Sequence, residues 1–251
     1  MNRWHRLAAA LAVLAPLAAA AAEPTCAVPP SLLETAATLP EWSVAALDRA
    51  SPLRVVALGS GTTKGLGAST PAASFPARLE VALRARVGAR VTVLNQGVQR
   101  ETANDMMARL DRDVLAHKPH LVIWETGTVD AVRGVPLDDF GALLEAGVAH
   151  IREAGADVLL VNPQYARAMP RVVNLLPFVE AMRTFSASQD VMLFDRFEVM
   201  RYWVDNDVFH LDESVAPRLV GAEIDAVYDC IGQLIARMII DATPDAALAA
   251  K

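Results

Sequence analysis

Residues 53–65 read LRVVALGSGTTKG, and this stretch decides the fold. The apolar run at 53–58 contains β-branched residues and no charge beyond its second position, which predicts a strand buried on both faces. Gly59 and Gly61 end the run and allow a sharp turn away from the strand. Ligands of parallel sheets bind at the carboxyl ends of the strands, so the residues after 58 are expected to carry function.

Four further apolar runs repeat this pattern, and segments of helical period separate them. The runs are 90–94 (RVTVL), 120–124 (HLVIW), 157–161 (DVLLV) and 190–194 (DVMLF); the helical segments are 75–87, 101–118, 137–154, 177–188 and 214–240. Continuous apolar strands that alternate with amphipathic helices predict an α/β fold in which helices cover both faces of a parallel sheet. We expect one domain with a five-stranded sheet.

The N-terminus has the pattern of a signal peptide. Arg3 and Arg6 precede an apolar run at 7–17, and small residues follow it as far as Ala22. We expect cleavage after Ala22 and export, to the periplasm or the medium. The apolar run is too short to span a bilayer comfortably, so a stable membrane anchor is not expected. The expected division is therefore a signal peptide at 1–22, an N-terminal helical extension at 23–51, the main domain at 52–240 and a flexible tail at 241–251.

Charge and cysteine content restrict the possible partners. The chain has 29 acidic and 23 basic residues and a net charge of −6, which becomes more negative when Arg3 and Arg6 are removed. Such a surface repels phosphate backbones, so nucleic acid is not an expected partner. Cys26 and Cys230 are the two cysteines. In an oxidising compartment a disulfide between them is favoured, with two unrelated buried thiols as the alternative.

The loops that follow the predicted strands contain four short motifs. They are 59–65 (GSGTTKG), 95–97 (NQG), 127–130 (GTVD) and 207–210 (DVFH). In order and spacing these resemble the SGNH, or GDSL, hydrolase superfamily of esterases, lipases and carbohydrate deacetylases. The corresponding family motifs are Gly-Asp-Ser-x-Thr-x-Gly, Asn-x-Gly, Gly-x-Asn-Asp and Asp-x-x-His. The resemblance covers about residues 53–222 and implies a three-layer α/β/α, flavodoxin-like fold and acyl-transfer chemistry.

The resemblance assigns roles to several residues. His210 corresponds to the general base and Asp207 to the carboxylate that orients it. Gly97 corresponds to the glycine whose backbone N–H stabilises the oxyanion, and Asp130 matches the acidic residue of the third motif. These four residues would form the catalytic edge of an active family member.

Two catalytic positions of the family are substituted. Thr63 and Gly65 fix the register of the first motif, which puts Ser60 in place of its aspartate and Gly61 in place of the nucleophilic serine. Val129 replaces the asparagine that donates to the oxyanion. Loss of one side-chain oxyanion donor typically costs about 10²–10³ in rate. Loss of a triad member typically leaves only about 10³–10⁴ over the water reaction.

These substitutions leave three hypotheses. The first is a pseudoenzyme of carboxylic-ester hydrolase ancestry that binds an acylated small molecule or glycan, or a protein partner in the cell envelope. The second is an active esterase or deacetylase that uses Ser60 as a displaced nucleophile and His210 as base. The third is a purely structural scaffold. No cofactor or metal site is expected, since one histidine beside carboxylates is common on polar loops. Tyr202, Trp203 and Phe209 could form a stacking wall, although ordinary packing also explains them.

Overall fold

The structure is a computed structural model that describes residues 26–48, 50–165, 173–210 and 217–245. The predicted signal peptide at 1–22 and residues 246–251 of the predicted tail lie outside the described residues. Within 23–51 the structure contains η1 (Pro30–Leu32) and α1 (Pro40–Leu47). The described chain continues past residue 240, and Thr243 is buried there and accepts a hydrogen bond from Trp42 Nε1 at 2.9 Å.

The sheet has five parallel strands in the order β2-β1-β3-β4-β5. The strands are β1 (Leu53–Gly59), β2 (Val91–Gly97), β3 (Leu121–Glu125), β4 (Asp157–Val161) and β5 (Met192–Phe194). This order is that of the flavodoxin-like doubly wound folds. The predicted α/β fold with a five-stranded parallel sheet is therefore confirmed.

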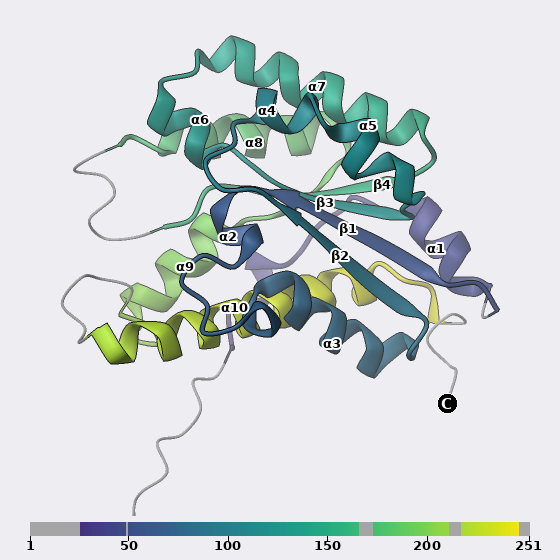
Figure 1. Cartoon of the computed structure of the whole chain (residues 1–251), viewed down its shortest axis with the longest axis horizontal. Coiled ribbons are helices and arrows are strands. Elements are labelled where there is room, and N and C mark those ends of the chain that lie inside the picture. Colours follow the sequence, from purple (N-terminus) through teal and green to yellow (C-terminus); the bar gives the residue numbers. More distant parts are fainter. Residues whose placement is uncertain (1–25, 49, 166–172, 211–216, 246–251) are drawn as a thin grey trace, which may run out of the picture.

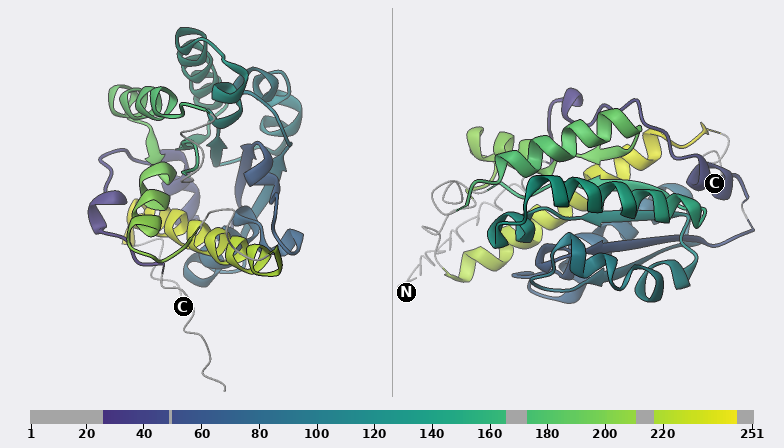
Figure 2. Two further views of the ribbon diagram at one scale, coloured as in Figure 1. Left: turned by 90° about the vertical axis from the view of Figure 1, so that its left-hand side faces the viewer. Right: turned by 90° about the horizontal axis from the view of Figure 1, so that it is seen from above.

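Helices cover both faces of the sheet and complete three layers (Figure 1). In addition to η1 and α1, they are α2 (Gly61–Lys64), η2 (Pro71–Ala73), α3 (Phe75–Val87), α4 (Ala103–Met107), α5 (Leu110–Asp113), η3 (Leu115–His117), α6 (Thr128–Arg133), α7 (Leu137–Glu153), α8 (Leu176–Gln189), α9 (Arg196–Asp205) and α10 (Pro217–Asp241). Helices α4, α5, α7 and α8 form one layer, and α3, α9 and α10 lie on the opposite face. In the left view of Figure 2 the carboxyl edge of the sheet faces the reader between these layers.

Strand residues alternate between two apolar cores. Val55 and Ile123 belong to the core on the α3 and α10 side, whereas Val56 and Trp124 belong to the core under α4 and α7. This alternation follows from the period of two in a strand. Because both faces are covered, neither set can be polar, which explains the continuous apolar runs in the sequence.

The helix expected at 101–118 is broken, and the prediction of one continuous helix is wrong. At the break, Arg109 has φ −121° and ψ 5°, outside the helical region. Its buried side chain turns to the carboxylate of Glu101 and the carbonyl of Gln96, both at 2.8 Å. These tertiary contacts override the apolar periodicity.

Helix α9 was not anticipated from sequence. Asp195 caps its first turn by accepting from the N–H of Glu198 at 3.2 Å. Trp203 near its end is fully buried and packs edge-on against Phe209, with ring centroids 5.1 Å apart. The two rings are part of the core, so ordinary packing accounts for them and not a ligand-stacking wall.

Cys26 and Cys230 form a disulfide that ties the N-terminal segment to α10. The disulfide favoured on sequence grounds is therefore confirmed. Separately, no helix within the described ranges is long and apolar enough to cross a membrane.

Removing the disulfide is expected to destabilise the fold strongly, because the bridge joins residues 204 positions apart. We expect the Cys26→Ala/Cys230→Ala variant to lose about 2–5 kcal/mol of unfolding free energy in urea denaturation. Dithiothreitol should lower the wild-type midpoint to that of the double variant and leave the variant unchanged. Equal stability of the two proteins would contradict this expectation.

Asp157 carries a pH-dependent stability contribution at the amino end of β4. Its Oδ2 accepts from the N–H of Trp42 at 2.8 Å, and burial raises the pKa of this carboxyl from 3.8 to about 6. The folded state therefore holds the proton more tightly than the unfolded chain, and stability falls as pH rises from about 4 to about 6. We expect wild type to lose about 1–3 kcal/mol relative to Asp157→Asn across this window, measured by urea denaturation at each pH. A pH-independent difference would show that the carboxyl does not titrate there.

Candidate functional site

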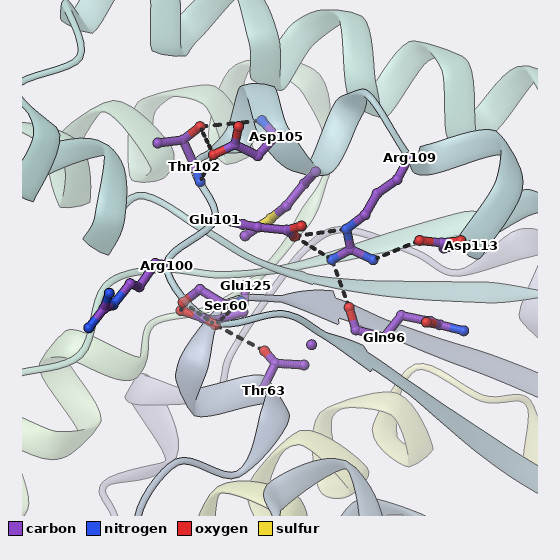
Figure 3. Close-up of polar contacts among 12 residues, drawn as sticks. Ser60, Thr63, Gln96, Arg100, Glu101, Thr102, Asp105, Arg109, Asp113 and Glu125 are labelled. Atoms are coloured by element: carbon purple, nitrogen blue, oxygen red, sulfur yellow. Dashed lines mark hydrogen bonds and ion pairs between the residues drawn. The ribbon is translucent and has the colours of Figure 1, made fainter.

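A buried polar cluster lies at the carboxyl edge of the sheet, where the loops after β1, β3, β4 and β5 meet. Figure 3 shows Ser60 and Thr63, which follow β1, directed toward Glu125 at the end of β3. Glu125 and Arg196, the first residue of α9, are each only 1% exposed. The cluster thus joins segments that are far apart in the sequence.

Glu125 is the acceptor at the centre of the cluster. Its Oε2 accepts from the backbone N–H of Ser60 at 2.9 Å, the Ser60 hydroxyl at 3.2 Å and the Thr63 hydroxyl at 2.9 Å. Its Oε1 pairs with Nη2 of Arg196 at 3.0 Å. Both carboxylate oxygens are therefore satisfied within the protein, as a buried charge requires.

Arg196 extends the cluster to the end of β4. Its Nε donates to the carbonyl of Asn162 at 3.0 Å, and its Nη1 donates to the hydroxyl of Thr62 at 2.9 Å. The Asn162 side chain in turn donates to Asp195 at 2.7 Å and accepts from the N–H of Phe197 at 3.0 Å. One guanidinium thus fixes the loop after β1 relative to the start of α9.

The charge state of Glu125 results from two opposing effects. Burial raises the pKa of this carboxyl, but the positive charge of Arg196 and the hydrogen bonds from Ser60 and Thr63 outweigh it and lower the pKa. Glu125 is therefore an ionised carboxylate whose affinity for a proton is low. That makes it a poor general base for the Ser60 hydroxyl.

Two glycines allow α2 to pack closely on the strand ends. A Cβ at Gly59 would lie 2.1 Å from Thr63 Oγ1, and a Cβ at Gly97 would lie 2.2 Å from the backbone nitrogen of Lys64. No side chain fits at either position. The spacing of glycines in the first two motifs is thus a requirement of backbone packing as well as of any chemistry.

The serine and the glycine of the first motif face different surroundings. Ser60 is 6% exposed, and its hydroxyl is directed inward to Glu125. Gly61 begins α2 and is partly exposed; a Cβ there would lie 3.4 Å from Leu66 Cδ2 and 3.9 Å from Gln99 Cγ. These are ordinary contact distances, so there is room for a Cβ at position 61, which the resemblance assigns to the nucleophile.

The residues assigned to the oxyanion site differ in burial and in hydrogen-bond partners. The N–H of Gly97 donates to Asn95 Oδ1 at 2.9 Å, so an oxyanion would compete with that side chain. Val129 is half-buried in the first turn of α6. Asp130 is fully buried and accepts from the N–H groups of Ala103 at 2.9 Å and Gly127 at 3.1 Å. Burial raises the pKa of Asp130 against these hydrogen bonds, and its contacts position α4 and α6.

His210 and Asp207 do not form a hydrogen bond with each other within the described residues. The His210 side chain is 67% exposed, and its Nδ1 lies 3.7 Å from the carboxylate of Glu223 on α10. Asp207 is exposed and has a positive φ of 54°. The described geometry brings Ser60 to Glu125 and His210 to Glu223, and it gives no contact between the two pairs.

Sequence reasoning missed Glu125, Arg196 and Asn162 as members of the cluster. The sequence feature that could have indicated them is their place in the chain, since each lies at or shortly after the end of an apolar strand. Their mutual contacts could not be read from the sequence. Across the described ranges, no group of three or more His, Cys, Asp or Glu side chains is placed to hold a metal ion.

Comparison with known proteins supports the resemblance seen in the motifs. The profile of the Non-GDSL lipase-like family matches residues 25–245. An arylesterase from Vibrio mimicus is 31% identical over 149 residues, which span 58% of this chain and 70% of the relative.

Solved structures share the fold. A protein of the G-D-S-L family from Desulfitobacterium hafniense has a TM-score of 0.60 at 25% identity, over 74% of this chain and 98% of that one. An acetylxylan esterase from Geobacillus stearothermophilus has a TM-score of 0.58 at 18% identity, over 75% and 94% of the two chains.

Glu125→Gln is expected to destabilise the protein, because it leaves the Arg196 guanidinium buried without a carboxylate. We expect a loss of about 3–5 kcal/mol of unfolding free energy, with partial recovery in Glu125→Gln/Arg196→Met. Glu180→Gln is the matched control, since it breaks an exposed ion pair with Arg183 and should cost at most about 1 kcal/mol.

The effect of Glu125→Gln should also depend on pH. Because the pKa of Glu125 is lowered, its contribution is present above the ordinary value of 4.5 and is lost as pH falls through the folded-state pKa. The stability difference between wild type and Glu125→Gln should therefore shrink in acid. A difference that grows in acid would contradict an ionised Glu125.

Proposed function

The chain belongs to the Non-GDSL lipase-like family of SGNH-type hydrolases, and from that premise we propose that it is an exported, catalytically impaired esterase homologue. In this proposal it binds an acylated ligand at the carboxyl edge of the sheet. The observation that supports the proposal is Gly61 at the first position of α2, where the resemblance to the GDSL motif would put the nucleophilic serine. Glycine has no group that could attack an ester carbonyl.

Apolar side chains beside Gly61 support an acyl ligand. Leu66 is 59% exposed and lies against the position where a Gly61 side chain would be. Val98 is 40% exposed, and its N–H donates to the carbonyl of Gly59 at the end of β1. In small-molecule sites, apolar side chains commonly bind the apolar part of a ligand, and a few polar groups fix its orientation. Val129, where the family has asparagine, adds a further apolar group near this edge.

The rival proposal is an active esterase in which Ser60 acts as a displaced nucleophile, and the contacts of Ser60 bear on it. One observation favours the rival, namely that the Ser60 hydroxyl already lies 3.2 Å from a carboxylate oxygen. Against it, the lowered pKa of Glu125 makes that carboxylate a weak base, and Ser60 is almost fully buried. The inward direction of the hydroxyl therefore favours a structural role for Ser60.

Export is part of the proposal. The disulfide between Cys26 and Cys230 is of a kind that persists in oxidising compartments such as the periplasm. Together with the signal-peptide pattern at 1–22, it supports export, and a protein partner in the cell envelope would be met there.

A fluorophosphonate probe with mass-spectrometric mapping tests the impairment. We expect no labelling of wild type and the gain of a label at position 61 in Gly61→Ser/Val129→Asn, which restores the hydroxyl and an oxyanion donor. The donor alone should contribute about 10²–10³ in rate relative to Gly61→Ser. Labelling of wild type at Ser60 that disappears in Ser60→Ala and His210→Ala would overturn the proposal and establish the rival.

A thermal-shift comparison tests ligand binding. Ethyl butyrate and an acetylated xylo-oligosaccharide represent the acyl and glycan classes, and a ligand at 100 times its Kd should add about 2.7 kcal/mol of stability. A shift with the ester supports an acyl site, and a shift with the oligosaccharide alone directs the proposal to glycans. Absence of any shift would favour a scaffold without a ligand.

A further inference from the structure

A groove of about 490 Å³ lies at the same edge of the sheet as the proposed acyl site. Arginines from three segments line it: Arg100 after β2, Arg109 and Arg112 around α5, and Arg133 at the end of α6. Glu101 and Asp105 line it as well, so the lining has four basic and two acidic side chains on a chain whose net charge is −6. Guanidinium groups are suited to bind carboxylate and phosphate groups through paired hydrogen bonds.

Three of these arginines already have carboxylate partners. Arg109 pairs with Glu101 at 2.6 Å, Arg112 makes two hydrogen bonds with Asp113 at 2.6 and 2.8 Å, and Arg133 lies 3.4 Å from Asp105. Arg100 is exposed, and its guanidinium has no hydrogen bond or ion pair with any residue in the described ranges. Among the four arginines that line this groove, Arg100 is the one without a carboxylate partner within the described residues.

The backbone holds Arg100 in an unusual conformation. Its φ is 66°, in the left-handed region that favours glycine. Its carbonyl accepts a hydrogen bond from Nη2 of Arg133 at 2.7 Å. Two residues on, Thr102 forms a capping box with Asp105 at the start of α4. The contacts of Arg133 and of the capping box therefore hold Arg100 in a backbone conformation that glycine adopts more easily. Residues held in such conformations occur often at binding sites.

The groove is adjacent to the family's nucleophile position. Gln99 lines the groove, and its Cγ lies 3.9 Å from the position of a Cβ on Gly61. Arg133 is four residues after Val129 on α6, so the two share one face of that helix. Figure 3 shows Arg100 at the same edge as Ser60 and Glu125, with its side chain extending away from the Glu125 carboxylate.

We propose that Arg100 is a specificity-determining residue that binds an anionic group, a carboxylate or a phosphate, on the acylated ligand. This inference rests on the proposed function, since the acyl part of the ligand would lie beside Gly61 and Leu66. The apolar side chains receive the acyl chain, and the guanidinium receives the charged end. Neutral esters of the same shape bind more weakly, because they leave Arg100 without a partner.

Two related esters, one charged and one neutral, test the assignment. Monoethyl succinate and ethyl butyrate differ only by a carboxylate in place of a methyl group, and binding is followed by amide chemical shifts in NMR titrations. We expect wild type to bind monoethyl succinate roughly tenfold or more tightly than ethyl butyrate. A charge-assisted hydrogen bond between the carboxylate and Arg100 would contribute affinity of this size. Competition by succinate and by inorganic phosphate identifies which of the two anions Arg100 prefers.

Arg100→Gly and Arg112→Ala form a matched pair of variants. Each removes one positive charge from the groove, but only Arg100→Gly removes the unpaired guanidinium. Glycine also suits the positive φ, so the thermal midpoint of Arg100→Gly should equal or exceed that of wild type. We expect the preference for monoethyl succinate to fall to about one in Arg100→Gly and to be retained in Arg112→Ala.

The outcomes separate this inference from the proposed function. Equal affinity of wild type for the two esters, or a preference that survives in Arg100→Gly, would overturn the role of Arg100 and leave the acyl site standing. Arg100-dependent binding of succinate or phosphate without any binding of ethyl butyrate would support the anion site and count against the acyl site. Absence of binding by both esters and both anions would overturn the role of Arg100 and the acyl site, and only a shift with the oligosaccharide would then support a ligand.

Discussion

The buried ion pair between Glu125 and Arg196 is the interaction on which the carboxyl edge depends. Taking both charges out of water is costly, and the cost is met only because each remaining polar atom of the pair has a partner. Those partners are the loop after β1, through Ser60, Thr62 and Thr63, and the loop after β4, through Asn162. The pair therefore sets the relative positions of loops that begin on different strands.

The same interaction determines what Ser60 can do. Its backbone N–H and its hydroxyl both donate to Glu125, so the side chain belongs to the interior of the cluster. Gly61, one residue on, is the position that faces Leu66 and Gln99 at the partly exposed edge. A serine one residue early is thus not equivalent to a serine at the nucleophile position, because consecutive residues at the end of a strand point in different directions.

The carboxyl edge combines three kinds of surface within a short span. The ion-paired cluster is closed to ligands, the apolar side chains near Gly61 are exposed, and Arg100 presents an unpaired charge beside them. In our proposal, this edge binds an amphiphilic small molecule and performs no chemistry on it. The sheet and the loops at its carboxyl edge are those of the SGNH-type fold. In our proposal, Gly61 and Val129 stand where the GDSL motifs have a nucleophile and an oxyanion donor.

The sequence by itself determined the five-stranded parallel sheet and the order of its loops. The substitution of catalytic groups by Gly61 and Val129 stays a prediction from the motifs. Apolar runs and glycine spacing are local signals, and a parallel sheet brings the carboxyl ends of its strands to one edge. Only the tertiary structure decided that Glu125 meets Arg196, 71 residues later in the chain, and that Arg109 interrupts a helix. It also decided that, among the four arginines lining the groove, Arg100 has no carboxylate partner within the described residues. These outcomes depend on which side chains meet across elements, and hydrophobic periodicity carries no information about such pairings.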